Sequence, residues 1–539
     1  LPQCAITETC DSTPIFYFPE RTNMALPSND NDNWQTCLDK VSSSVVSLKI
    51  NITRPYDGNG CSHTLATGFV VYLNGTEGLI LTNRHVVTVG PIRGVATFGN
   101  HEEVPVFPIY RDPIHDFGFF KFDASRIRFM KVVPIVLDPS GAKVGTEVRV
   151  IGNDAGEKLS ILSGTIARTD RDAPVYSATG YNDFNTFYIS AASSTSGGSS
   201  GSPVLNLSGS AVAINAGGRV KEATSYYYPL DRIVRALDLI KQHGIEHAST
   251  VVTRGTIQTV FKYHPYDETR RLGLPVQLEE EIRTKNPEGT GMLVVEKIVP
   301  EGPGSVAGLQ PGDILLSLNT ELCTSFTVLE ATMDQLIEEQ GHGGGSLDLV
   351  VWRGAAKLHV AVAVEDLHQL VPVQLLEIGQ SAFHTLSYHQ AINFHVKCQG
   401  IFVAWAGYML KRAGIPQHVV IDSIDNVPLT GITETMTLLN ALPNQKSVPF
   451  RYRSLFNQHV QKVKLVKIDR TWFPMSMMKR NDTTGLWDEM PGVASTIPPK
   501  EKPQVQNTTF MRVPRYVWIL LVGLFVRCSL CFVLCALCF

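Results

Sequence analysis

A sequence motif in the second half of the chain occurs twice, and no other feature constrains the fold as strongly. Residues 308–319 read GLQPGDILLSLN and residues 414–425 read GIPQHVVIDSID, each directly after an alanine. Upstream, GMLV at 291–294 resembles GIFV at 400–403. Each copy is followed by a helical stretch and by a pair of apolar segments. Because self-similarity at a fixed period indicates a repeated supersecondary unit, we expect two related domains within 255–470.

The residues before this repeat have the pattern of short β-strands. Residues 41–50 (VSSSVVSLKI) combine alternation with β-branched residues, which is typical of a half-buried strand. The apolar runs 66–73 and 79–82 flank the turn-like sequence NGTEG, which predicts a hairpin. Clear helical periodicity comes only at 230–243, with Asp231 as the expected N-cap. We therefore predict an all-β unit closed by one helix.

The two ends of the chain differ from this body. The first 33 residues are polar and contain prolines and an Asn/Asp run, so we expect a variable leader. Residues 471–515 are polar and Pro-rich and are expected to be a linker. Residues 516–539 are almost all apolar and, at about 1.5 Å per residue, long enough to cross a bilayer as a helix, although Arg527 lies within them. A membrane anchor, a segment packed against protein and a non-native chain end are all open interpretations.

Composition excludes several classes of protein. The 539 residues are enough for about three to five domains. Lys and Arg number 47 and Asp and Glu number 50, a net charge of −3 that argues against a dedicated nucleic-acid binder. Ten cysteines, four of them in the last twelve residues, are too few for a disulfide framework, which favours a reduced, intracellular setting. No metal-ligand spacing or phosphate-binding GxxxxGK motif is present in the sequence, so we predict neither a metal nor a cofactor.

Three short islands in the β unit carry chemistry only when taken together. They read LTNRHVV at 81–87, DPIHDFGFFKFD at 112–123 and GGSSGSPVL at 197–205. Alone, a histidine is more often structural, an aspartate before a strand usually caps a turn, and a Gly/Ser loop is usually a linker. A nucleophilic serine, however, needs a base to take its proton and an acid to orient that base.

The order of the three residues supports such a triad. His85, Asp116 and Ser200 follow one another as in the chymotrypsin-type double barrel. We therefore predict Ser200 as nucleophile, His85 as general base and then acid, and Asp116 as the group that orients it. The flexible glycines would let the N–H groups of Gly198 and Ser200 converge as an oxyanion hole. Two other serines compete for the role of nucleophile, namely Ser199 and Ser202.

These motifs resemble those of a known family. TNRHVV, HDFGFFKF and GGSSGSPV are similar to motifs of the HtrA serine proteases, and the stretches 100–123 and 254–274 resemble their large fungal nuclear branch, which is implicated in apoptosis. The resemblance implies a mainly β protein, with a trypsin-like double β-barrel protease domain followed by two PDZ-like α+β domains. HtrA loops usually read Gly-Asn-Ser-Gly-Gly-Pro, and in this chain Ser199 replaces the asparagine and Ser202 replaces the second glycine. The large branch continues into a second, degenerate half, so this chain resembles only its first half.

On this basis we expect six segments. They are a leader (1–33), a trypsin-like serine protease domain (34–250), PDZ domain 1 (255–368), a partly degenerate PDZ-like domain 2 (371–470), a linker (471–515) and the hydrophobic tail (516–539).

The resemblance also gives expectations about partners. PDZ domains capture an extended peptide at a sheet edge and hold its C-terminal carboxylate with backbone N–H groups. We predict that Leu272, Gly273 and Leu274 form this carboxylate loop for hydrophobic C-terminal peptides in domain 1. In domain 2 the corresponding place is Leu386-Ser387-Tyr388, where serine replaces glycine, so domain 1 is expected to bind peptide better.

Specificity, assembly and location are expected as follows. Ser194, six residues before the nucleophile, is uncharged at the base of the expected specificity pocket, which favours cleavage after small or medium apolar residues of protein substrates. HtrA proteins are commonly trimers, and the resemblance favours the nucleus. The alternative from another class is a catalytically silent PDZ scaffold or holdase. A third possibility is a protease tethered to a membrane by its tail.

Overall fold

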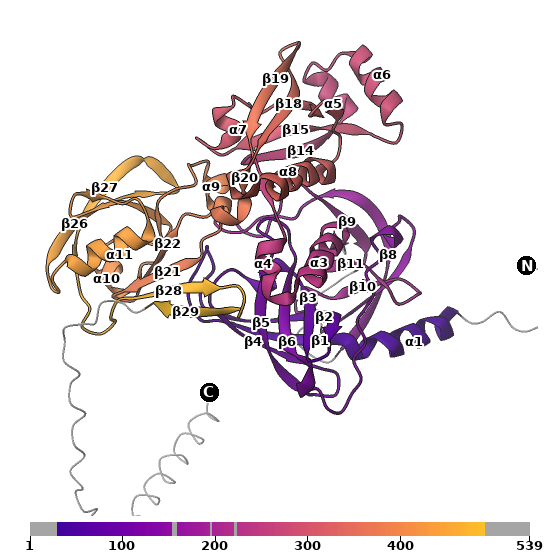
Figure 1. Ribbon diagram of the computed structural model, residues 1–539, viewed down its shortest axis with the longest axis horizontal. Helices are drawn as coiled ribbons and strands as arrows, with labels where there is room; N and C mark the ends of the chain where they lie inside the picture. The colour runs from indigo at the N-terminus through magenta and orange to yellow at the C-terminus, as the bar shows by residue number, and fades with distance from the viewer. Residues whose placement is uncertain (1–29, 154–158, 194–196, 220–223, 491–539) are drawn as a thin grey trace, which may run out of the picture. The chain divides into compact units, whose positions relative to one another are not determined.

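The computed structural model describes residues 30–153, 159–193, 197–219 and 224–490, and the chain's path through them is drawn in Figure 1. The predicted leader lies outside these residues except for its last four positions, as does the hydrophobic segment 516–539. Among the described residues, no helix is both long and apolar enough to cross a membrane.

The first half of the described chain forms two closed six-stranded barrels. In the first, the strand order is β1-β2-β3-β6-β5-β4, with β1 (Val45–Ile52), β2 (Ser62–Asn74), β3 (Glu77–Thr82), β4 (Ile92–Thr97), β5 (Glu103–Arg111) and β6 (Gly118–Asp123). In the second, the order is β10-β11-β12-β9-β8-β7, with β7 (Glu147–Gly152), β8 (Ser160–Asp172), β9 (Phe187–Ala192), β10 (Pro203–Leu205), β11 (Ala211–Arg219) and β12 (Thr224–Pro229). All neighbouring strands are antiparallel, as expected for barrels built from hairpins.

Helices lie around the barrels. They are α1 (Asp30–Val41), α2 (Arg84–Val87), α3 (Asp231–His243) and α4 (Ala248–Val251). Helix α3 buries Ile233, Leu237 and Ile240 on one face, which confirms the predicted periodicity. Asp231 is the first helical residue and not the N-cap, which is Leu230 without a side-chain cap. Its carboxylate lies in the first turn, where the helix dipole favours negative charge.

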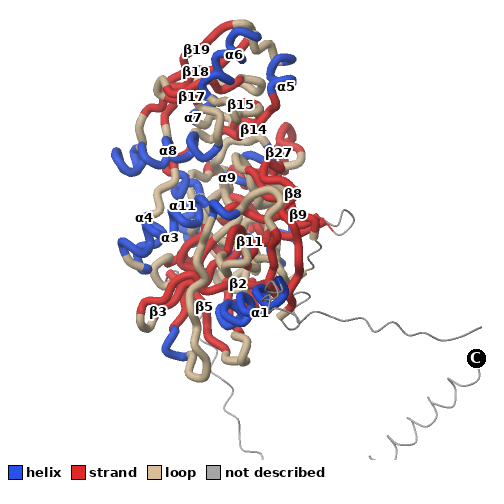
Figure 2. The backbone as a smooth tube through the Cα atoms, turned by 90° about the vertical axis from the view of Figure 1, so that its right-hand side faces the viewer, coloured by secondary structure: helices blue, strands red, loops and turns tan. Residues whose placement is uncertain are grey.

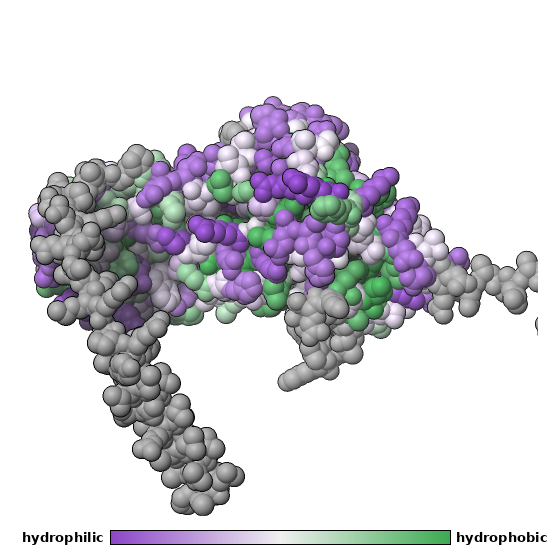
Figure 3. Space-filling model, turned by 90° about the horizontal axis from the view of Figure 1, so that it is seen from below, coloured by the Kyte–Doolittle hydropathy of each residue, from purple (hydrophilic) through white to green (hydrophobic). Residues whose placement is uncertain are grey.

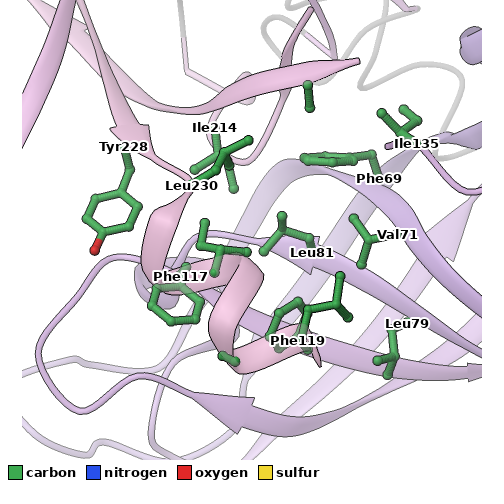
Figure 4. Packing of buried hydrophobic residues seen from close by; sticks show 14 of the residues in the cluster. Phe69, Val71, Leu79, Leu81, Phe117, Phe119, Ile135, Ile214, Tyr228 and Leu230 are labelled. Atoms are coloured by element: carbon green, nitrogen blue, oxygen red, sulfur yellow. The ribbon is translucent and has the colours of Figure 1, made fainter. Parts of the chain in front are cut away.

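The core that the two barrels share fixes the position of the predicted catalytic islands. Figure 4 shows Leu81, Phe117 and Phe119 of the first barrel beside Ile214 and Tyr228 of the second. The rings of Phe117 and Tyr228 stack with centroids 6.0 Å apart. Fully burying each such aromatic side chain stabilises the fold by about 1.5–3 kcal/mol. Phe117 directly follows Asp116, so this packing ties the aspartate to both barrels.

The two predicted repeats follow as two α+β domains, here called repeat 1 (residues 255–366) and repeat 2 (residues 374–490). In repeat 1, the strands are β14 (Thr259–Pro265), β15 (Gly291–Ile298), β16 (Ile314–Leu318), β17 (Glu321–Leu322), β18 (Ser346–Arg353) and β19 (Ala356–Ala363), and β13 (Gly255–Thr256) pairs with β20 (Glu365–Asp366). Its helices are α5 (Tyr266–Arg271), α6 (Val276–Lys285), α7 (Pro303–Val306) and α8 (Phe326–Gln340).

Repeat 2 has a larger sheet. Its strands are β21 (Gln374–Ile378), β22 (Ser381–Thr385), β23 (Ile401–Trp405), β24 (Val419–Ile424), β25 (Val427–Pro428), β26 (Ser447–Ser454), β27 (Asn457–Lys467), β28 (Ser476–Asn481) and β29 (Leu486–Met490). Its helices are α9 (Tyr388–Phe394), α10 (Gly407–Ala413) and α11 (Ile432–Ala441). In Figure 2 the strands of both repeats and both barrels dominate, with helices at their margins. The mainly β fold of two barrels and two α+β domains is as predicted.

Two segments differ from expectation. Residues 41–44 complete helix α1 and a 3-10 turn, so the first strand begins at Val45 and not at Val41. Residues 476–490, expected to be linker, form the hairpin β28–β29, which adds to β21 and buries Met477 in the core of repeat 2. The reason is that the Pro-rich composition starts only at Pro491, whereas SMMKRN and LWDEM can both pair in a sheet.

The surface is mixed. In the view of Figure 3, hydrophilic side chains cover much of the described surface and apolar patches lie between them.

Candidate active site

The predicted base and acid are in direct contact. His85 lies in the short helix α2 immediately after β3, and Asp116 lies in the loop that precedes β6. The ring Nδ1 of His85 is 3.0 Å from both carboxylate oxygens of Asp116. The backbone N–H of His85 also donates to Asp116 Oδ1 at 3.0 Å. The Asp116 side chain is fully buried, whereas that of His85 is 27% exposed. A buried carboxylate beside a partly exposed imidazole is the arrangement that the predicted acid and base require.

A tyrosine not predicted from the sequence completes the environment of Asp116. Tyr176 donates its hydroxyl to Asp116 Oδ2 at 2.7 Å, and its ring lies 5.4 Å from that of His85. Burial alone would raise the pKa of Asp116, but the charge of His85 and the hydrogen bonds from His85 and Tyr176 bring this pKa below its ordinary value. The carboxylate is therefore held ionised, as an orienting group must be.

The three neighbouring serines have different environments. Ser202 is fully buried, and its Oγ has no hydrogen-bond partner among the described residues. Ser199 is 1% exposed, and its Oγ accepts from Asn215 Nδ2 at 3.1 Å, beneath the loop. Ser200 alone of the three is partly exposed. Burial therefore favours Ser200 over both competitors as the residue open to substrate.

The loop around Ser200 is fastened to strand β2 through one residue, Thr67. The Thr67 N–H donates to the Ser200 carbonyl at 2.8 Å, and its hydroxyl donates to the Gly198 carbonyl at 2.9 Å. Thr82, at the end of the strand that leads to His85, donates to the Thr67 carbonyl at 2.8 Å. The serine loop and the strand before the base are thus fixed to the same point.

The fastened loop leaves two N–H groups available. Among the described residues, no acceptor is paired with the N–H of Gly198 or of Ser200, while the Gly201 N–H donates to the Asn215 carbonyl at 2.8 Å. Gly198 and Gly201 have φ of +103° and +87°, a region that suits glycine. These are the two N–H groups that we predict for the oxyanion hole, and unused donors are what such a hole needs.

Sequence reasoning missed Thr67 and Tyr176. Both act across the barrels on residues far away in sequence, and neither stands in a motif that marks it. Ser194, the predicted specificity residue, lies outside the described residues. Within those residues, no group of three His, Cys, Asp or Glu side chains could hold a metal ion.

The predicted carboxylate loop of repeat 1 is a helix cap in this structure. Helix α5 ends at Arg271, and the N–H groups of Leu272, Gly273 and Leu274 donate to the carbonyls of Glu268, Arg270 and Thr269. Gly273 has φ of +94°, as in the Schellman motif, which closes a helix C-terminus. All three N–H groups are used in this cap, so a peptide carboxylate bound here would have to replace these hydrogen bonds, and the carboxylate loop stays a prediction.

The sheet edge of repeat 1 lies elsewhere, at strand β14. Within the described part of the chain, this strand pairs only with β15 and ends the sheet. The side chain of Asn185, from the loop before β9, lies against the open edge: it accepts from the Phe261 N–H at 2.7 Å and donates to the Thr259 carbonyl at 3.3 Å. A cavity of about 450 Å³ adjoins this edge and is lined in part by Phe261, Tyr263 and Phe326.

Repeat 2 lacks this open edge. Its corresponding strand β22 pairs with β23 on one side and with β21 on the other, and β28 and β29 extend the sheet beyond β21. Ser387, in the place expected for a second carboxylate loop, caps helix α9 through its side chain. Strand β21 therefore fills the position at which a peptide could join β22.

Comparisons with known proteins assign the three domains. A family profile described as a trypsin-like peptidase domain matches residues 66–214. Profiles described as a PDZ domain and a PDZ-like domain match residues 294–353 and 369–445.

Curated relatives match most of this chain. It is 43% identical to Protease Do-like 7 of Arabidopsis thaliana, over 89% of this chain and 43% of that protein. It is 44% identical to Pro-apoptotic serine protease NMA111 of Coccidioides immitis, over 91% of this chain and 46% of that protein. It is 43% identical to Pro-apoptotic serine protease NMA111 of Saccharomyces cerevisiae strain S288c, over 88% of this chain and 46% of that protein. The chain thus spans less than half the length of these relatives.

Among solved structures, HtrA-type protease AlgW with tripeptide matches at 19% identity and a TM-score of 0.45, over 62% of this chain and 97% of that chain. The family profiles show that the chain carries a trypsin-like peptidase domain followed by two PDZ domains, and over most of its length it is similar to the serine proteases Protease Do-like 7 and NMA111.

Proposed function

We propose that this chain is a serine endopeptidase that hydrolyses peptide bonds in protein substrates, with repeat 1 as its peptide-recognition domain. The observation that carries the proposal is the contact between His85 Nδ1 and the buried carboxylate of Asp116. A silent PDZ scaffold or holdase would have no need of a buried ionised acid that orients an accessible histidine.

The proposed mechanism uses the groups already described. Ser200 Oγ attacks the scissile carbonyl while His85 takes its proton at Nε2, and the Nδ1–H donates to Asp116 throughout. The N–H groups of Gly198 and Ser200 stabilise the oxyanion, and loss of one such donor typically costs about 10²–10³ in kcat. His85 then gives the proton to the leaving amine. Water, activated by His85, releases the acyl group from Ser200.

A fluorophosphonate probe tests the proposal. Wild-type protein should be labelled and should cleave an unfolded protein, and Ser200→Ala should lose both properties. Ser202→Ala is the matched control and should keep both, because the Ser202 side chain is fully buried. If the wild-type protein were neither labelled nor active, the scaffold or holdase would be the better explanation.

Cleavage specificity is proposed from the sequence position of Ser194, six residues before the nucleophile. We propose that substrates are cut after small or medium apolar residues, because Ser194 offers no charge to pair with Lys or Arg. A peptide library read by mass spectrometry checks this, and a strong preference for cleavage after Lys would refute it.

Repeat 1 is proposed to bind hydrophobic C-terminal peptides by strand addition at the edge of β14. Its support is the sheet edge at β14, against which the Asn185 side chain lies, beside a cavity whose lining includes Phe261, Tyr263 and Phe326. In repeat 2 the equivalent strand is interior, so we propose that it binds such peptides weakly. Titration of a hydrophobic C-terminal peptide into the Ser200→Ala protein, in which cleavage cannot occur, should reveal one site.

Location and assembly are also proposals. An intracellular setting is supported by four free cysteines among the described residues, namely Cys37, Cys61, Cys323 and Cys398. We propose a nuclear protease, checked by cell fractionation, and a homotrimer, checked by light scattering. Anchoring through 516–539 would require that the protein resist extraction by carbonate.

A further inference from the structure

The loop that carries Asp116, here called the acid loop (residues 112–117), is held by side chains from both repeats. Glu330 of helix α8 lies 2.8 Å from His115 Nε2. Arg254, just before β13, lies 3.2 Å from the carboxylate of Asp112. His389 of helix α9 donates from Nε2 to the Pro113 carbonyl at 2.7 Å. The acid loop is therefore not positioned by the barrels alone.

His115 is the centre of these contacts. It directly precedes Asp116, and its ring is fully buried between two carboxylates. Its Nδ1 lies 2.9 Å from Asp183 Oδ1, and its Nε2 faces Glu330. With Glu330 and Asp183 both ionised, each carboxylate can only accept, so each ring nitrogen donates and the ring is an imidazolium. The Asp183 carboxylate links His115 to the catalytic aspartate's main chain, because its Oδ2 accepts a hydrogen bond from the backbone N–H of Asp116 at 3.1 Å.

Further charges around the cluster stabilise this arrangement. Arg232 of helix α3 pairs with Glu330, and Arg254 lies 3.6 Å from the same carboxylate. Burial and Arg232 disfavour the charged ring, yet Glu330 and Asp183 raise the pKa of His115 above its ordinary value. Removing one member of such a buried ion cluster leaves its partner's charge uncompensated, which is costly.

We propose that Glu330 is a positioning residue for the peptidase reaction, acting from repeat 1 through His115 and Asp183 on the main chain at Asp116. By this route the PDZ domain fixes the acid that orients His85. The proposal rests on the endopeptidase activity proposed above. It predicts that removing the charge of Glu330 lowers kcat, which reports the chemical step, while KM for a substrate bound at the barrels changes little.

Glu330→Gln in the full chain tests this, and Glu338→Gln is its matched control. Glu338 lies on the same helix two turns further on and pairs with Arg235 of α3, as Glu330 pairs with Arg232, but it does not contact the acid loop. The substrate is a short internally quenched peptide with an amidated C-terminus. We measure kcat per acylated serine by burst titration, so that unfolded molecules do not count.

We expect Glu330→Gln to lower kcat about tenfold with KM changed less than twofold, since small displacements of catalytic groups have effects of this size or larger. In Glu330→Gln, the low-field proton NMR resonance of the His85 Nδ1–H, which is hydrogen-bonded to Asp116, should broaden or shift. Glu330→Asp, which keeps the charge, should restore part of the rate. Glu338→Gln should resemble the wild type in all these measurements.

The outcomes separate this proposal from the proposed function. A wild-type chain that is neither acylated nor active would contradict the endopeptidase activity itself. An active wild type with an unchanged kcat and proton resonance in Glu330→Gln would overturn the positioning role alone. So would an equal loss in Glu338→Gln, because the effect would then come from helix docking in general. If Glu330→Gln fails to fold, Glu330→Asp decides, since an unchanged rate and resonance there would contradict the proposal.

Discussion

Adding a single Cβ atom at Gly201 would displace the loop that carries Ser200. A Cβ on Gly201 would lie 2.1 Å from the Thr67 carbonyl oxygen, and its φ of +87° disfavours any other residue. The backbone cannot yield there, because Thr67 also fastens Ser200. We therefore expect Gly201→Ala to lower kcat/KM by about 10²-fold or more, the size of effect seen when an oxyanion donor is lost.

The neighbouring Gly197 supplies the control. A Cβ there meets nothing within 4 Å, so Gly197→Ala should keep most of the wild-type kcat/KM in the same peptide assay. If both variants were equally active, the Thr67 contact would not limit the loop.

A second residue-level prediction concerns Tyr176. Its hydroxyl is one of the hydrogen-bond donors that keep Asp116 ionised. Tyr176→Phe removes this bond with little change in volume, and a bond to a charged group contributes about 1.5–3 kcal/mol. We expect a roughly tenfold lower kcat, measured at constant pH. Tyr181→Phe is the control, because the Tyr181 hydroxyl has no partner among the described residues, and an equal loss there would contradict the role of Tyr176.

At the scale of elements, the loop before β9 occupies the edge of strand β14 at which a peptide would bind. An incoming peptide strand must displace Asn185 from the Phe261 N–H and the Thr259 carbonyl. Asn185→Gly frees this edge without strain at a φ of +54°. The peptide then no longer has to break the two Asn185 hydrogen bonds, which together contribute about 1 kcal/mol, so its Kd should fall roughly fivefold. Fluorescence polarisation with the Ser200→Ala protein measures this Kd.

The same assay decides between the two candidate peptide sites. Leu272 is 44% exposed, so Leu272→Ser should fold normally. If the peptide carboxylate were bound at 272–274, this variant would weaken binding and Asn185→Gly would have no effect. The opposite pattern supports the edge of β14.

Sequence patterns foretold the elements better than the contacts between them. The repeat at 308 and 414 is local in each copy, so its strands and helix could be read from spacing. Strands β28 and β29 could not, because β28 is held by pairing with β21, about a hundred residues away in sequence, and β29 pairs in turn with β28. The role of Leu272–Leu274 stays a prediction, because an apolar-Gly-apolar sequence serves equally as a helix cap. The residues that support His85 and Asp116, such as Thr67, depend on closure of the barrels.

At the scale of the molecule, the buried ion cluster makes stability depend on pH. The pKa of His115 is raised from its ordinary 6.5 in the folded protein. Its stabilising contribution is therefore fully present below pH 6.5 and is lost as the pH rises through the folded pKa. We expect the difference in Tm between wild type and His115→Gln to be largest near pH 6 and to shrink on going to higher pH.

Differential scanning fluorimetry across this range provides the measurement. His243 is exposed at the end of α3, so His243→Gln, which replaces a histidine outside the buried cluster, is the control. A His115→Gln difference that grew with rising pH would show that the buried ring is not charged.

Helix α8 places Phe326, Glu330, Asp334 and Glu338 at intervals of four residues. The first lines the cavity beside β14, and the other three pair with arginines that include Arg232, Arg235 and Arg254. A single inserted or deleted residue would rotate everything beyond it by about 100° and break this alignment. The length of α8 should consequently be invariant among proteins built on this plan. Variation in length belongs instead in the glycine-rich turn at 341–345, where the helix has already ended.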